Sequence, residues 1–203
     1  MGDTKKIRRK YAKPIHPWNK ERIDEERRYK RTYGLTTKKE LWKSESTLKG
    51  FKNQIKSFPS MEPEQAAKQK ELLRARLRKL GLLQADQDLG VILGYTTEQL
   101  LERRLQTIVL KKGLARTSKQ ARQMIIHEHI LVAGKKINAP SYLVTKEEEA
   151  QIAFSRKSPF FDEQHPERVT EEKTPKQPPK KEIPQEEKPE VVELDEDDEV
   201  LDE

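Results

Sequence analysis

Residues 102–141 read ERRLQTIVLKKGLARTSKQARQMIIHEHILVAGKKINAPS, and this stretch is the most informative feature of the sequence. Its apolar residues first recur at helical spacing, as Leu105, Ile108 and Val109 show,. From His129 onward, successive residues alternate between two faces with the period of a half-buried strand,. The stretch therefore predicts a small helix–turn–helix–hairpin module.

Capping signals set the expected ends of these elements. Thr96 with Gln99, and Thr117 with Gln120, match the capping box that opens a helix,. Gly113 lies where the first of the two helices should end,. We therefore expect one helix from about residue 97 to Gly113 and a second from Thr117. We expect strands over residues 129–133, 137–144 and 151–154, with a lysine-bearing turn at residues 133–136.

The outer surface of this module is expected to be basic. Helical spacing turns Ala121, Met124 and Ile125 inward and leaves cationic side chains on the other side of the second helix,. Its N-terminus near Thr117 adds free N–H groups that favour an anion,. Nothing that resembles a reaction centre accompanies these residues, so the pattern indicates RNA binding and not catalysis. The side chains left for a polyanion are Arg104, Arg116, Lys119, Arg122 and His127.

Composition limits how much of the chain can bury a core. Of its 203 residues, 38% are charged and only 33% are hydrophobic, so part of the chain must stay solvated or be ordered by a partner. The absence of cysteine excludes disulfides and thiolate metal sites,. No apolar run reaches the roughly 20 residues that span a bilayer, and no signal peptide is visible,. We expect a soluble, cytoplasmic protein that has no membrane partner and is not an obligate homo-oligomer.

Charge is distributed unevenly along the chain. Residues 1–60 hold 18 Lys and Arg against 7 Asp and Glu, whereas residues 158–203 hold 6 against 17. The net charge of +7 therefore conceals a strongly basic body and an acidic tail. This polarity is typical of a nucleic-acid binder that carries a separate interaction segment.

Residues 1–35 are expected to form an extended basic arm. Pro14 and Pro17 disfavour a helix, and aromatic rings are interleaved with the cations of this segment,. Phosphates attract such cations, and rings can stack on unpaired bases. The alternative is a disordered terminus whose Trp18 docks into the protein's own core. On the RNA hypothesis, the contacts are Arg8, Arg9, Lys10 and Trp18.

A helical region is expected over residues 36–96. Thr37 and Glu40 match a capping box, and apolar residues follow them at helical spacing,. A second helix is expected to stop at Gly81,. With the small α+β RNA-binding module at residues 97–166, the expected fold class is α+β, with a mostly helical N-terminal region.

Residues 167–203 form an acidic tail rich in proline and glutamate. Five prolines and the absence of an apolar period predict disorder,. Two interpretations remain open. In one, the tail recruits a partner or competes with RNA for the basic body; in the other, it only keeps the chain soluble.

The module and the arm together resemble a known family. The strings RRLQTIVLKKGLART, QARQMIIHEHI and GKKINAPSY are similar to small-subunit ribosomal protein four. The strings GDTKKIRRKYAKPIHPWNKERI and KKELWKSES resemble its archaeal form, so the match covers roughly residues 1–168. The module alone also occurs in pseudouridine synthases, a tyrosine-specific tRNA synthetase and a heat-shock RNA-binding protein, but the arm and the helical region set these apart.

This resemblance implies a structural protein that binds small-subunit ribosomal RNA directly and needs no cofactor. It implies early entry into assembly, near a multi-helix junction of the RNA 5′ domain. It also implies a place at the messenger RNA entry pore, beside small-subunit proteins three and five. Carried over by position, the RNA-facing residues are Arg104, Arg116, Ser118, Lys119, Arg122, Gln123, His127 and Lys135.

Three features depart from the family pattern. Glu128 stands between two histidines where many relatives have glycine, so an acid could repel phosphate there or change how the helix ends. Ala133 and Gly134 replace the usual Asn-Gly turn, and a positive φ at Ala133 would cost about 1 kcal/mol,. The cysteines that bind zinc in some bacterial relatives are absent.

Competing interpretations of the residues are weaker. His127 and His129 invite a metal site, but the chain lacks cysteine and only Glu128 adds a nearby carboxylate,. Residues 90–94 lack the spacing and the Lys-Ser/Thr end of a phosphate loop, and nothing assembles a catalytic triad,. An RNA-modifying enzyme would need a catalytic domain for which the chain has no room. The remaining alternative is a free RNA chaperone or stress-response RNA binder that uses the same module.

Overall fold

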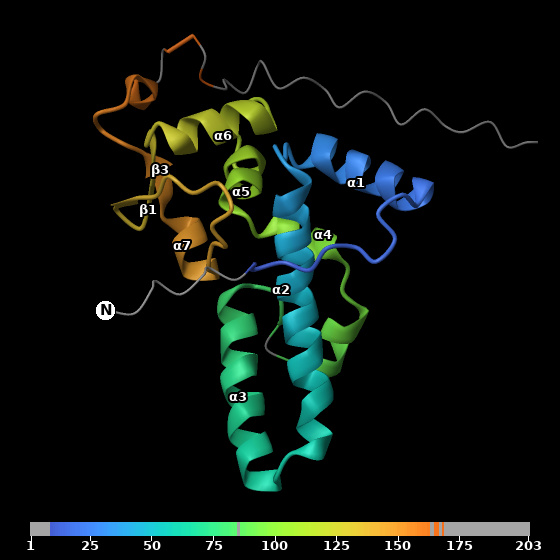
Figure 1. The fold of residues 1–203 in the computed structure, drawn as a ribbon. Coiled ribbons are helices and arrows are strands. Elements are labelled where there is room, and N and C mark those ends of the chain that lie inside the picture. Colours follow the sequence, from blue (N-terminus) through green and yellow to red (C-terminus); the bar gives the residue numbers. More distant parts are fainter. Residues whose placement is uncertain (1–8, 85, 163–164, 167, 169–203) are drawn as a thin grey trace, which may run out of the picture.

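The computed structural model describes residues 9–84, 86–162, 165–166 and 168 of the chain (Figure 1). Helices and a small antiparallel sheet make up this part, which confirms the predicted α+β class. The expected RNA contact at Arg8 and nearly all of the acidic tail lie outside the described residues.

The N-terminal part is built on a long helix, α2 (Lys38–Ser57), which forms a hairpin with α3 (Pro63–Lys79) through a 3-10 turn at Phe58–Ser60 (Figure 1). As predicted, α3 stops just before Gly81, where the backbone takes a φ of +71°,. The apolar side chains of the hairpin share one core with a second 3-10 turn at Leu89–Gly94 and with the start of the next helix. The members of this core include Leu48, Phe51, Leu73, Leu77, Ile92 and Leu100.

The prediction of an extended arm over residues 1–35 is wrong for its second half, because α1 occupies Lys20–Thr32. Asn19 caps this helix through its Oδ1, which accepts a hydrogen bond from the Arg22 N–H at 3.5 Å,. Arg22 in turn pairs with Glu26, one helical turn further on, at 3.2 Å,. The proline signal ends at Pro17, so it carries no information against a helix that begins three residues later.

The single helix expected between about residue 97 and Gly113 is in fact two helices, α4 (Thr97–Glu102) and α5 (Leu105–Lys111). Between them, Arg104 has extended backbone and forms an isolated β-bridge with Leu143. A tertiary contact therefore replaces the helical hydrogen bonds that local spacing predicted. This bridge is also the only strand-like pairing in the region where a strand was expected over residues 137–144, all of which the structure describes.

The C-terminal module places α5 and the following helix, α6 (Ser118–Ile126), over a three-stranded antiparallel sheet. The strands are β1 (Ile130–Val132), β2 (Lys135–Lys136) and β3 (Ile152–Phe154). The sheet order is β2-β1-β3, so the strands predicted near residues 129–133 and 151–154 are confirmed, with β1 in the centre. The core between these layers includes Leu105, Ile108, Val109, Met124, Ile125 and Ile130. The remaining elements of the module are α7 (Lys146–Ala150) and a 3-10 turn at Pro159–Phe161.

Two side-chain-bearing residues of this module have left-handed backbone, Glu128 with φ 58° and Ala133 with φ 49°. Glu128 follows the cap of α6, where glycine is usual,. Ala133 and Gly134 form the two-residue turn between β1 and β2, and Gly134 also has a positive φ of 75°. Positive φ at both turn positions is the type I′ geometry that favours Asn-Gly. Both departures from the family pattern thus fall where a Cβ is unfavourable.

The N-terminal part and the C-terminal module meet at a small apolar cluster of Leu35, Leu41 and Leu101, against which Tyr29 and Tyr33 pack. Leu35 belongs to the loop between α1 and α2, and Leu101 belongs to α4. This loop and the start of α2 also contact the module through polar groups. We call the cluster and these polar contacts the junction.

Candidate nucleic-acid interface

Helix α6 separates an apolar side from a polar one, as the sequence predicted. Ala121, Met124 and Ile125 are buried in the module core. The helix begins at Thr117, whose Oγ1 accepts a hydrogen bond from the Gln120 N–H at 3.2 Å,. The Gln120 side chain does not complete a capping box, because its Oε1 accepts from the Arg116 N–H at 2.7 Å.

The exposed side of α6 and its two ends carry the predicted donors. Side chains at positions 119, 122, 123 and the C-cap 127 share one face because they follow the i, i+3, i+4, i+8 spacing of a helix,. Ile126 is 49% exposed between them, an apolar contact that the sequence reasoning missed because its neighbour Ile125 belongs to the core. We call this surface the basic face, and it consists of Arg116, Lys119, Arg122, Gln123, Ile126 and His127.

The structure distributes the other predicted contacts over several environments. Lys135 is exposed in β2, and Arg9, Lys10 and Trp18 are exposed in the arm. Ser118 is half-buried on the inward side of α6, and its carbonyl accepts a hydrogen bond from the Gln106 Nε2 at 2.7 Å. Ser118 therefore faces the junction and not the basic face.

Arg104 is not on the outer surface, and that expectation was wrong. The side chain is only 3% exposed, and its Nη2 donates to the Glu40 Oε2 at 2.8 Å. The reason is the break between α4 and α5, which turns Arg104 toward the start of α2. Burial lowers the pKa of the Arg104 guanidinium, and the contact with Glu40 offsets part of that effect,.

Glu40 holds a second arginine as well. Its Oε1 accepts from the Arg122 Nη2 at 3.1 Å, and its Oε2 accepts from the Arg122 Nη1 at 3.2 Å. Burial acts to raise the pKa of Glu40, but hydrogen bonds and charge from Arg122 and Arg104 outweigh burial and hold the pKa below its usual value,. The sequence predicted a capping role for Glu40 beside Thr37, and no side-chain cap forms there.

Glu128 does not stand as a free acid beside the basic face. Its Oε2 lies 2.9 Å from the Nζ of Lys136. This ion pair compensates the negative charge locally, so the phosphate repulsion suggested by the sequence is reduced. Both side chains remain about half exposed, which leaves the pair open to exchange with an anionic ligand,.

His129 is held by contacts with Ser158 and Phe160, whereas His127 is exposed. The His129 Nδ1 lies 3.0 Å from the Ser158 Oγ, and the His129 ring meets Phe160 edge-on at 5.1 Å between centroids,. Burial and the neighbouring His127 lower the pKa of His129, which favours the neutral imidazole,. Among the described residues, no group of three or more His, Cys, Asp or Glu side chains could hold a metal ion.

The arm lies along α2. The Ala12 N–H donates to the Ser46 Oγ at 2.9 Å, and the Tyr11 ring lies 6.0 Å from the Trp42 ring. Trp18 is 89% exposed, so the alternative in which it docks into the protein's own core is wrong. An exposed ring at the end of a basic segment can stack on a base.

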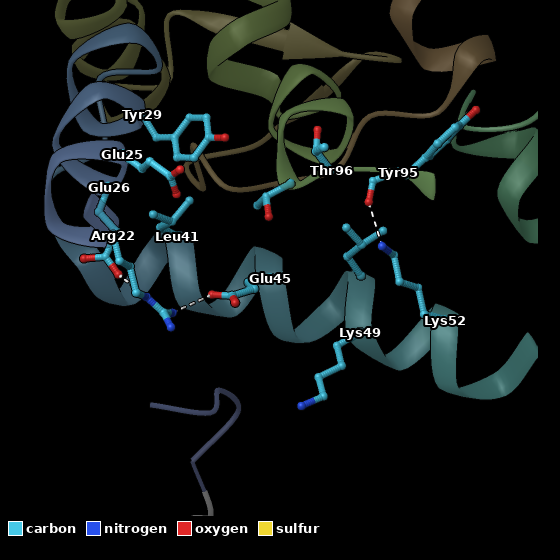
Figure 2. A pocket seen from close by; sticks show the side chains of 12 residues that line it. Arg22, Glu25, Glu26, Tyr29, Leu41, Glu45, Lys49, Lys52, Tyr95 and Thr96 are labelled. Carbon is cyan, nitrogen blue, oxygen red and sulfur yellow. Dashed lines mark hydrogen bonds and ion pairs between the residues drawn. The ribbon is translucent and has the colours of Figure 1, made fainter. Parts of the chain in front are cut away.

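A hollow of about 510 Å³ opens between α1, α2 and the start of α4 (Figure 2). Arg22 contacts Glu45 at 3.3 Å, and the Lys52 Nζ donates to the Tyr95 carbonyl at 2.7 Å. Figure 2 shows acidic and basic side chains interspersed around the opening. A hollow with balanced charge does not favour a polyanion, so the basic face remains the better candidate.

Comparison with known proteins agrees with this geometry. The S4 domain family matches residues 103–149, which span α5, α6 and the hairpin. The chain is 46% identical over 172 residues to the small ribosomal subunit protein uS4 of Hyperthermus butylicus, covering 85% of this chain and 98% of that protein. It is 48% identical over 170 residues to uS4 of Methanococcus aeolicus, covering 83% and 96%.

The chain belongs to the uS4 family of small ribosomal subunit proteins. This membership confirms the resemblance drawn from the arm and the module, and it confirms a structural ribosomal protein over an enzyme, because the relatives are named as ribosomal proteins. It also confirms the expected location, since uS4 proteins are components of the small ribosomal subunit in the cytoplasm. None of the helices in the described chain is long and apolar enough to cross a membrane.

Proposed function

We propose that this protein binds small-subunit ribosomal RNA directly and that the basic face is a main contact. The observation that carries the proposal is the set of exposed donors on one side of α6, opposite the side buried in the core. Within the described chain, the side chains of Lys119 and Gln123 make no hydrogen bond or ion pair, so both are available to a ligand.

The chemistry of the basic face suits folded RNA. Glu40 engages the Arg122 fork, and the Arg116 Nη2 donates to the carbonyls of Pro166 and Arg168. Lysine therefore offers the readiest charge for a phosphate oxygen, as a mobile point charge. The Gln123 amide and a His127 N–H can donate to sugar or phosphate oxygens. Double-helical RNA presents phosphates and 2′-hydroxyl groups in a wide minor groove, so shape decides where such a surface binds.

The arm supplies a second region of contact. Arg9 and Lys10 are exposed, and the exposed ring of Trp18 lies further along the same segment. Arm and basic face together extend the interface over both parts of the molecule. Lys135 in the turn beside the sheet adds another exposed cation.

Family membership supports a more specific site. We place the protein at a multi-helix junction in the 5′ domain of the small-subunit RNA, where it enters early in assembly. In the finished subunit it lies near the messenger RNA entry pore, beside small-subunit proteins three and five. Support for this placement is the match of more than four fifths of the chain to uS4 proteins.

The test is binding of the purified protein to the 5′-domain RNA of its own organism, against a scrambled RNA of equal length. We expect the native RNA to stay bound at about 0.2 M salt while the scrambled RNA dissociates, because counterion release weakens purely electrostatic binding. Equal loss of both RNAs would contradict the proposal and favour a free chaperone or stress-response binder.

Two lysine variants locate the interface. Lys119→Ala should weaken native-RNA binding and lower the slope of log K against log salt by about 1. Lys146→Ala is the matched control, because it removes an exposed lysine from α7, which lies at the other end of the module from α6 (Figure 1). An unchanged salt slope in the first variant would exclude Lys119 from the interface.

A further inference from the structure

The carboxylate of Glu40 joins three segments that are far apart in the sequence. Arg104 comes from the break between α4 and α5, 64 residues after Glu40, and Arg122 comes from α6, 82 residues after it. The three side chains are 3%, 17% and 25% exposed for Arg104, Glu40 and Arg122 respectively. The cluster therefore lies inside the junction and reaches the surface only at Arg122.

Two arginines this close together need the acid between them. The charge of Arg122 acts to lower the pKa of Arg104, which is the sign of repulsion between the two guanidinium groups,. The Nε of Arg104 is buried and has no hydrogen-bond partner in the described chain, so Glu40 is the principal compensation for this charge. Removing one partner of such a buried group leaves a charge that cannot be solvated.

A second contact holds the same surfaces together. The Gln106 Nε2 donates both to the Gly34 carbonyl at 3.2 Å and to the Ser118 carbonyl at 2.7 Å. Gly34 belongs to the loop that leads into α2, and Ser118 is the first residue of α6. The loop before Glu40 and the helix that carries the basic face are thus fixed at two adjacent points.

We propose that Glu40 is a positioning residue, which holds α6 and its basic face in one fixed orientation against the N-terminal helices. Glu40 carries a negative charge and does not itself contact RNA. Glu40 accepts hydrogen bonds from both Nη atoms of Arg122, so it also fixes the position of that guanidinium on the basic face. The arm on α2 and the basic face then form one rigid surface that matches a folded RNA. The RNA part of this inference rests on the proposed function; the orientation part does not.

The orientation is measured without RNA. The chain contains no cysteine, so two spin labels can be attached to one molecule at introduced cysteines. One cysteine replaces the exposed Asn53 on α2 and the other replaces the exposed Glu147 on α7. We expect a narrow distance distribution in the otherwise unaltered protein and a broader one in Glu40→Gln and Glu40→Asp. Glu45→Gln is the control, since Glu45 lies on the same helix and makes an exposed pair with Arg22. Equally narrow distributions in all four proteins would overturn the proposal.

RNA binding separates positioning from charge. If Glu40 acted only by its charge, Glu40→Gln would tighten binding to native and scrambled RNA alike, as Glu45→Gln should. A positioning role predicts that Glu40→Gln binds native RNA less well. The ratio of its affinities for native and scrambled RNA should fall about tenfold. Glu40→Asp keeps the charge but shortens the reach, so it should show the same loss of preference.

Each outcome has a defined meaning. Circular dichroism establishes that each variant is folded, and if Glu40→Gln does not fold, the milder Glu40→Asp decides. Native preference retained in folded Glu40→Asp, with a narrow distance distribution, would overturn the positioning role. If the unaltered protein shows no preference for native RNA, the proposed function fails, and the distance measurement still judges the role of Glu40 in the junction.

Discussion

Gly34 and Ser118 approach so closely that a Cβ on Gly34 would lie 2.5 Å from the Ser118 Oγ. Gly34 also has a φ of +61°, which residues with a side chain rarely adopt,. Both facts require glycine at the loop between α1 and α2. The contact explains how a loop from the N-terminal part can lie directly against the first turn of α6.

Gly34→Ala is therefore expected to destabilise the protein by about 2 kcal/mol or more, because left-handed strain alone costs 1–2 kcal/mol. Urea unfolding of the purified protein measures the change. Gly50→Ala is the matched control, since Gly50 lies within α2 and nothing stands within 4 Å of its added Cβ. That variant should gain up to about 1 kcal/mol from helix propensity. If Gly34→Ala leaves the free energy of unfolding unchanged, the junction can accommodate a Cβ at this position without strain.

Ala133→Asn should stabilise the protein by about 1 kcal/mol, because asparagine tolerates the left-handed φ of 49° at this turn position,. Ala133 is exposed, so the larger side chain meets no packing penalty. Thermal unfolding is a sufficient measurement. Ala67→Asn is the control at an exposed position inside α3, and it should destabilise the protein by about 0.5 kcal/mol,. Two shifts of the same sign would contradict the role of the turn geometry.

The pKa of Glu40 makes a signed prediction about stability and pH. Contacts with Arg122 and Arg104 hold this pKa below its ordinary value of 4.5. The carboxylate therefore stabilises the fold above the unfolded pKa, and this contribution is lost as the pH falls through the folded pKa. At pH 7 the free energy of unfolding of Glu40→Gln should be about 3 kcal/mol lower than that of the unaltered protein. This difference between the two proteins should become smaller below pH 4.5. Urea unfolding at several pH values tests this, and a constant gap would exclude titration of Glu40 as its origin.

Local periodicity was enough to predict the two sides of α6. Core residues recur at helical spacing there, so the face that bears Lys119 and Gln123 follows from the positions of Met124 and Ile125. The turn at Ala133 was likewise predictable, because left-handed φ is a property of two adjacent residues. These features depend on neighbours in sequence, where pattern is informative.

The position of Arg104 could not be read from the sequence. Helical spacing continued through Leu101 and Leu105, and only the bridge to Leu143, 39 residues later, breaks the helix at Arg104. Glu40 followed Thr37 at the spacing of a capping box, so the local pattern already supplied it with a role,. Its actual partners lie 64 and 82 residues away. A tertiary contact overrode a local signal in both cases.

The two tryptophans should separate RNA binding from stability. Trp18 is 89% exposed, so Trp18→Ala should leave urea unfolding unchanged while weakening native-RNA binding by about 1–3 kcal/mol, the worth of one stacked base,. Trp42 is half-buried, and its Nε1 donates to the Glu26 Oε1 at 2.9 Å. Trp42→Ala should therefore lower stability by about 2 kcal/mol, since it exposes apolar surface and removes a donor from a buried carboxylate. If Trp18→Ala binds native RNA with unchanged affinity, the Trp18 ring is not part of the interface, and the arm contributes only its cations.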